Sequence, residues 1–134
     1  MILHQVAQHV DDLERAIVFY TRLIGEPPVA TFDPPGLAFF RLGDTRLLLE
    51  RGAPSALIYL RVDDVRVTID RLRTEGVSIA DEAHVIFSDA EGIFGPVGAD
   101  EWMGFITDSE GNLVGLASQN PPERSAGESG LDAQ

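Results

Sequence analysis

The sequence predicts an α+β domain built from two βαβββ modules, because the same sequence pattern occurs twice in the chain. Each copy has a Val-Asp-Asp motif at the end of a strand, an apolar pattern with helical spacing and a glycine that ends the helix. The first copy runs from Val10 to Gly25, and the second, 52 positions later, runs from Val62 to Gly76. Strand and turn signals follow both copies, so each helix is expected to be followed by three strands.

Composition narrows the functional classes. The 134 residues suffice for one compact domain, and 10 basic against 22 acidic residues give a net charge of −12. An acidic surface repels phosphate backbones and anionic lipid, so neither nucleic acid nor a membrane is an expected partner. The chain has no Cys, and no basic leader or long apolar segment is evident, so we expect a cytoplasmic protein.

The first module is predicted from residue 2 onward. Asp11 or Asp12 is expected to cap the helix. Its apolar face is predicted to contain Leu13, Ala16, Ile17, Tyr20 and Leu23 or Ile24. The other expected elements are a strand over 2–10, an extended segment over 29–32, and strands over 37–42 and 45–50 joined by a turn at 43–44.

The second module repeats this order. Asp63 or Asp64 is expected to cap the helix, whose buried face should contain Val65, Thr68, Ile69 and Leu72. Strands are expected over 56–62, 77–80, 83–87, 101–107 and 113–118, with an interruption at 81–82 and a long loop over 88–100. We therefore expect a single domain over 1–120, with modules at about 1–51 and 56–120, and a flexible tail over 121–134.

The doubled pattern resembles the vicinal oxygen chelate superfamily, which includes glyoxalase I, bleomycin-resistance proteins and extradiol dioxygenases. The matching runs are Val10-Asp11-Asp12-Leu13, Val62-Asp63-Asp64-Val65 and Asp108-Ser109-Glu110-Gly111-Asn112-Leu113. The segments 83–86 and 101–105 are similar to a glyoxalase-like branch of that superfamily. The resemblance implies a cup-shaped mixed sheet with helices packed outside, a small-molecule site in the cup, and a homodimer.

Metal-binding members of this superfamily hold a divalent ion with side chains that point into the cup. Carried over to this sequence, the four ligand positions fall on Gln5, Leu47, Leu57 and Gly115. Only Gln5 has a donor atom, and a neutral amide is a poor ligand for a transition metal. The resemblance therefore predicts a degenerate metal site and no cofactor, with a divalent metal held at non-standard positions by His4, Glu50 and His84 as the alternative.

Because side chains alternate between the two faces of a strand, the candidate ligand-binding residues can be assigned to one face or the other. If Ile58, Leu60 and Val62 face the helices, then Leu57, Tyr59 and Arg61 face the cup, and by the repeat Gln5, Ala7 and His9 do the same. Ligand-binding candidates are Gln5, His9, Tyr59, Arg61, His84 and Trp102. The structural alternatives are an ion pair at the rim for Arg61, a packed aromatic for Tyr59, an exposed ring for His9, and a core or interface position for Trp102.

Three functions stay open on the sequence. The first is the binding of a small organic molecule without chemistry, as in bleomycin-resistance proteins. The second is a metal-dependent lyase, isomerase or dioxygenase with ligands at non-standard positions, and the third is an interaction module that acts through dimerisation. Catalytic residues, and whether the protein is an enzyme, are not predicted.

Overall fold

A computed structural model describes residues 3–123 and confirms the predicted fold class, α+β with two βαβββ modules. Residues 124–134 of the predicted tail lie outside the described residues. The first module contains β1 (Gln5–His9), α1 (Leu13–Ile24), β2 (Ala30–Phe32), β3 (Leu37–Leu42) and β4 (Thr45–Glu50). The second contains β5 (Ile58–Arg61), α2 (Val65–Thr74), β6 (Ser78–Asp89), β7 (Ala99–Thr107) and β8 (Leu113–Asn120).

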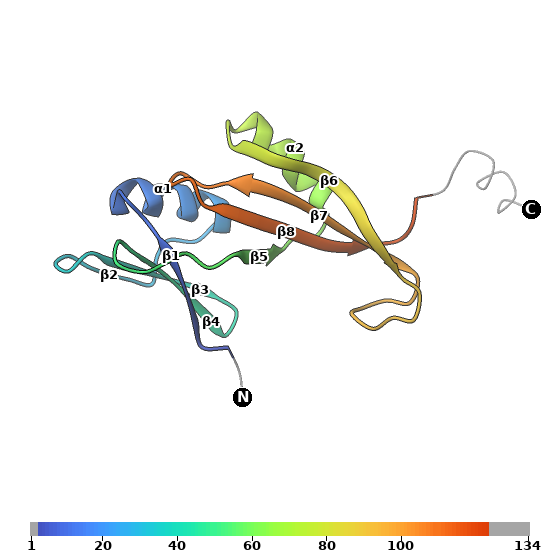
Figure 1. Cartoon of the computed structure of the whole chain (residues 1–134), viewed down its shortest axis with the longest axis horizontal. Coiled ribbons are helices and arrows are strands. Elements are labelled where there is room, and N and C mark those ends of the chain that lie inside the picture. Colours follow the sequence, from blue (N-terminus) through green and yellow to red (C-terminus); the bar gives the residue numbers. More distant parts are fainter. Residues whose placement is uncertain (1–2, 124–134) are drawn as a thin grey trace, which may run out of the picture.

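Each module forms its own four-stranded mixed sheet. The strand orders are β1-β4-β3-β2 and β5-β8-β7-β6, in which β1–β4 and β5–β8 are the parallel pairs and the others are antiparallel. The two sheets are not closed into a barrel. Figure 1 shows both helices on one side of the sheets, while the loop between β6 and β7 turns toward the other side. We call the face of each sheet that lies away from the helices the cup face.

Both helices begin and end where the sequence predicts. The Asp12 side chain accepts from the Arg15 amide, and Gly25 ends α1 with φ 85°. Asp64 caps α2 in the same way through the Arg66 amide. A carboxylate at this position satisfies amides that have no partner within the helix.

The core lies between the helices and the sheets. Its fully buried side chains include Tyr20 on α1, Phe40 and Leu49 on the first sheet, and Ile69 on α2. Thr68, predicted to be buried, is only half-buried. No helix within residues 3–123 is long and apolar enough to cross a membrane.

The region after α2 differs from the sequence prediction. Instead of two short strands with an interruption at 81–82, a single strand, β6, runs for 12 residues from Ser78 to Asp89. Its pairing with β7 shifts register at three places, including 79–81 and 81–84. Bulges of this kind let a strand bend and continue, so the acidic pair at 81–82 is accommodated within β6. The loop is consequently shorter than predicted, because β6 extends to Asp89 and β7 begins at Ala99.

The modules are joined at a contact that we call the closed seam, where the turn 108–112 packs against the start of α1. Glu110 accepts hydrogen bonds from the Asp11 and Asp12 amides, both at 2.8 Å, and pairs with the Arg15 Nε at 2.7 Å. These contacts lower the pKa of Glu110 to about 2; the Arg15 hydrogen bond contributes most. A carboxylate is also favoured at this end of the α1 dipole.

A buried carboxylate organises the same turn from within. Asp108 accepts from the Tyr20 hydroxyl at 2.7 Å and from the Glu110 and Asn112 amides at 2.8 and 2.7 Å. Burial, followed by the hydrogen bond to Asp108, raises the pKa of the Tyr20 phenol, so the hydroxyl stays a donor. Asn112 then donates to the His9 carbonyl at 2.7 Å. The run that carries the family resemblance is therefore a structural link between the two modules.

Candidate functional site

The structure confirms the predicted alternation of side chains along β5. Ile58 is 7% exposed and Leu60 packs against the core, whereas Leu57 and Tyr59 are each 51% exposed. The same alternation holds in β1, where Gln8 is fully buried and donates to the Tyr20 hydroxyl at 3.3 Å. Tyr59 and Arg61 therefore lie on the cup face, as the strand period predicts.

A hollow of about 370 Å³ lies on the cup face of the second module. Volumes of this size are typical of sites for small organic molecules. The residues that line it come from β5, β6, β7, β8 and the β6–β7 loop: Tyr59, Arg61, Phe87, Phe94, Glu101, Met103, Ala117, Ser118 and Gln119. The lining combines aromatic rings, a thioether, one guanidinium and one carboxylate. We call this site the aromatic hollow.

Two edge-to-face ring pairs stand at this face. Tyr59 lies against Phe105 with ring centroids 5.8 Å apart, and Phe87 lies against Phe94 at 5.7 Å. Gly115 is the reason that Tyr59 lies close to the sheet, because a Cβ at this glycine would come within 2.6 Å of the Tyr59 ring. Ring pairs of this geometry present a surface that suits another flat apolar group.

The β6–β7 loop is held beside the aromatic hollow by one carboxylate. Asp89 is 3% exposed and accepts from the amides of Ile93, Phe94 and Gly95 at 2.8 to 3.1 Å. Gln119 donates to the same carboxylate at 3.2 Å. Desolvation raises the pKa of Asp89, but these hydrogen bonds together outweigh it and leave the pKa lowered. The loop is therefore built around a fixed charge, and Phe94 is positioned by its own backbone amide.

On the first module, an arginine lies beside Gln5, one of the four ligand positions that the resemblance gives. The Arg46 Nε donates to the Gln5 Oε1 at 3.1 Å, and a terminal nitrogen of Arg46 lies 2.7 Å from the His4 Nε2. The guanidinium also lies over the Phe39 ring, 5.6 Å from its centroid. The only donor among the four carried-over positions is thus already bound to a cation. A divalent ion beside Arg46 would be repelled by like charge, so these residues do not fit a metal.

The carried-over position on β4 is wrong by one residue. Leu47 is fully buried in the core, and β1 pairs with β4 so that Gln5 is opposite Arg46 and Ala7 is opposite Leu48. A shift of one residue moves a side chain to the other face of the sheet.

The histidine candidates do not form a cluster. His9 lies opposite Glu50 in the β1–β4 pair and bonds the Asp11 carboxylate at 3.0 Å, which is the largest cause of its raised pKa. His84 is opposite Met103, on the same face as Tyr59, and its ring bonds the Glu82 carbonyl at 2.9 Å. Within residues 3–123, no group of three or more His, Cys, Asp or Glu side chains lies close enough to hold a metal ion. His4, Glu50 and His84 are not brought together.

Trp102 lies on the opposite face of β7 from the aromatic hollow. The Arg66 guanidinium of α2 stacks over its ring at 4.3 Å from the centroid, and the ring packs against the core. Its indole nitrogen is buried without a hydrogen-bond partner among the described residues. Trp102 therefore lies outside the aromatic hollow.

Sequence reasoning missed several residues of the aromatic hollow, namely Phe87, Phe94, Glu101, Met103 and Gln119. One feature of the sequence that could have indicated these residues is the length of the predicted loop over 88–100, since long loops are often functional. The alternation of Glu101, Met103 and Phe105 along β7 was a second one, because these residues share the face opposite Trp102.

Comparisons with known proteins agree with this fold. The model of the Glyoxalase/Bleomycin resistance protein/Dioxygenase superfamily matches residues 2–116, and the chain belongs to that superfamily. A comparison with curated proteins gave no match.

Among solved structures, the chain is similar to TnmS3, an antibiotic binding protein from Streptomyces sp. CB03234. The identity is 22%, with 91% of this chain and 97% of that one covered and a TM-score of 0.66. It is also similar to lactoylglutathione lyase from Agrobacterium tumefaciens, at 23% identity, with 87% and 92% covered and a TM-score of 0.64. At these identities, the likeness shows the shared fold.

Proposed function

We propose that the protein binds a small, largely planar organic molecule in the aromatic hollow, without transforming it and without a metal ion. The observation that carries this proposal is the lining of the hollow, in which Tyr59, Phe87, Phe94 and Met103 surround a space that suits a ring system. Arg61 and Glu101 add one charge of each sign for polar substituents. This is binding of the bleomycin-resistance type, and the antibiotic-binding function of the structural neighbour TnmS3 supports it.

Arg46 supports the metal-independent form of this proposal. Its guanidinium bonds the Gln5 amide oxygen and the His4 ring, and it supplies a fixed positive charge on the cup face of the first module. In this proposal, Tyr59 and Arg61 bind the ligand from the lining of the hollow, and Gln5 binds the part of a larger ligand that reaches the first module. Two further residues, His9 and His84, lie on the cup faces of the two sheets and are proposed to contact larger ligands.

A homodimer is part of the same proposal. Apolar side chains are exposed on and beside the cup faces, including Phe32 at 51%, Phe94 at 68% and Ile93 at 72%. The outer strands β2 and β6 are free sheet edges within the described chain. A second copy that faces these surfaces would cover them and enclose the ligand. Light scattering after size exclusion should give twice the chain mass.

The test begins with elemental analysis of protein purified without added metal, which should find no stoichiometric Zn, Fe, Mn or Ni. A planar antibiotic panel is then screened by thermal shift, and a binder should raise the melting temperature of the native protein. Phe94→Ala and Tyr59→Ala should weaken that ligand about tenfold each, since stacked aromatic anchors dominate such sites.

Val18→Ala, on the exposed side of α1, is the matched control and should leave binding unchanged. A stoichiometric metal, or turnover of a ligand that depends on an added metal, would instead support the lyase, isomerase or dioxygenase alternative. The cytoplasmic location stays a prediction.

A further inference from the structure

The sequence repeat makes two contact regions between the modules equivalent, and only one of them is closed. At the closed seam, the turn 108–112 of the second module fills the space beside the start of α1. The equivalent turn of the first module, Gly43-Asp44, has only two residues between β3 and β4. A cavity of about 760 Å³ lies between the modules at this place, lined by Leu42 and Gly43 on one side and by Thr68 and Arg71 of α2 on the other. We call this cavity the inter-module groove.

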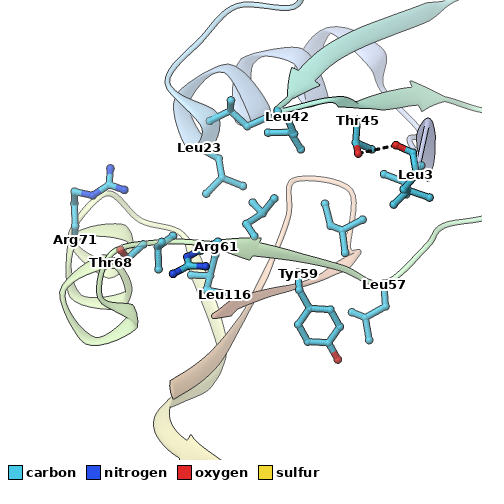
Figure 2. A pocket seen from close by; sticks show the side chains of 16 residues that line it. Leu3, Leu23, Leu42, Thr45, Leu57, Tyr59, Arg61, Thr68, Arg71 and Leu116 are labelled. Atoms are coloured by element: carbon cyan, nitrogen blue, oxygen red, sulfur yellow. Dashed lines mark hydrogen bonds between the residues drawn. The ribbon is translucent and has the colours of Figure 1, made fainter. Parts of the chain in front are cut away.

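The walls of the inter-module groove are mainly aliphatic. Leu23 and Leu42 of the first module lie across from β5, and Thr68 and Arg71 of α2 stand at one end (Figure 2). Ile58 and Leu60 line the groove from β5, and Tyr59 and Arg61 of the same strand also border it. Removal of such apolar surface from water favours the binding of an apolar group.

The charged residues of the groove have one sign. Arg61 and Arg71 line it, whereas no Asp or Glu does, although the chain has 22 acidic residues. Among the described residues, Arg71 pairs only with Glu75, at 3.2 Å and with both side chains about half exposed. An exposed pair on one helix is weak, and Arg61 has no ion pair within residues 3–123. Both guanidinium groups are therefore available to an incoming anion.

We propose that the inter-module groove binds an amphipathic carboxylate, with the apolar body between Leu23, Leu42 and Leu60 and the carboxylate against Arg71 and Arg61. The guanidinium fork suits a carboxylate, and the Thr68 hydroxyl at the same end is a further donor. The site goes beyond the proposed function, because α1, the β3–β4 turn and α2 line it and do not line the aromatic hollow; Tyr59 and Arg61 border both sites. Its ligand would bridge the modules where the short turn leaves them apart.

The experiment uses titration calorimetry of the full chain with decanoate, decan-1-ol and decyltrimethylammonium. Decanoate should bind, the alcohol should bind at least about tenfold more weakly, and the cation should not bind, because the charge at the end of the groove is positive. Arg71→Gln should weaken decanoate about tenfold, and Leu42→Trp, which fills the groove, should abolish binding.

Two controls separate this site from its surroundings and from the aromatic hollow. Arg73→Gln removes a cation of the same helix that pairs with Asp70 and Glu82 and does not line the groove, so decanoate binding should not change. Phe94→Ala alters only the aromatic hollow and should also leave decanoate unaffected. Retention of decanoate binding in Phe94→Ala, with loss of the planar ligand, distinguishes the two sites.

The proposal is overturned if decanoate does not bind, if all three amphiphiles bind equally well, or if Arg71→Gln leaves the affinity for decanoate unchanged. Thermal unfolding of each variant confirms that it is folded. Because Arg71 is exposed, its substitution is expected to leave the fold intact, so this variant decides the question even if Leu42→Trp does not fold.

Discussion

The closed seam and the inter-module groove occupy equivalent places in the repeat but have opposite character. At the closed seam, Asp108 accepts a hydrogen bond from the Tyr20 hydroxyl, and Glu110 accepts two from the backbone amides at the start of α1. At the groove, the turn has only two residues, and a mainly aliphatic cavity lies beside it. A difference of three residues in turn length therefore decides which contact holds the modules together and which is left for a ligand.

The largest expected effect is at Asp108. Replacing it by Ala leaves the Tyr20 hydroxyl and the amides of Glu110 and Asn112 without their acceptor, in a buried position. Unsatisfied buried donors are costly, so the free energy of unfolding should fall by about 3 kcal/mol. Urea unfolding measures this loss. Asp44→Ala at the equivalent turn of the groove is the control and should change stability by less than about 0.5 kcal/mol; equal losses would mean that the two turns do not differ.

A smaller effect, with a defined pH dependence, is expected at Glu110. Because its pKa is lowered from 4.5 to about 2 in the folded state, its contribution is fully present above pH 4.5 and is lost as the pH falls toward 2. Glu110→Gln should cost about 2 kcal/mol at pH 7. Unfolding curves between pH 2 and 7 should show that the difference in stability between the native protein and the variant shrinks toward the acidic end, because the native protein loses the contribution of the Glu110 charge there. A constant difference across this range would contradict the role of the charge.

Side-chain enlargement should also separate the two regions. Leu42→Phe adds volume at the wall of the groove and should change the free energy of unfolding by less than about 1 kcal/mol, since the ring has room. Ala16→Leu adds volume at a fully buried position on α1 and should cost about 1–3 kcal/mol. Thermal and urea unfolding of both variants provide the measurement, and a larger loss for Leu42→Phe would show that the groove is closed in solution.

The smallest effect is expected at the edge of the closed seam. The hydrogen bond to Asp11 raises the pKa of His9 above its ordinary value of 6.5. In Asp11→Asn the pKa of His9 should fall toward that value, because the partner charge is gone. An NMR titration of the His9 ring measures it. Asp44→Asn, at the other turn, should leave the titration of His9 unchanged, and a fall in the Asp11 variant that is no larger than in this control would refute the assignment.

Much of the fold was open to prediction because its signals are local. Asp12 and Asp64 cap the helices, Gly25 ends α1 in the left-handed conformation that glycine favours, and the alternation along β5 places Tyr59 on the cup face. The continuous β6 was not predicted, since the bulges that carry it past Asp81 depend on β7, its partner strand.

The candidate site was predictable only in part. Tyr59 and Arg61 follow from strand period, but Phe87 and Phe94 reach the aromatic hollow because Asp89 folds the β6–β7 loop back with three amide hydrogen bonds. Trp102 illustrates the reverse. A lone tryptophan suggests a stacking platform, whereas the register of β7 turns it toward α2.

The sequence by itself determined the doubled module, the helix boundaries and the faces of the first strands, because caps, glycines and side-chain period act between near neighbours in the chain. The tertiary structure decided which carboxylate meets which amide across the modules, where Arg46 stands relative to Gln5, and that the short turn at Gly43 leaves a groove. These features join residues that are far apart in the chain, and their positions depend on how the two modules pack.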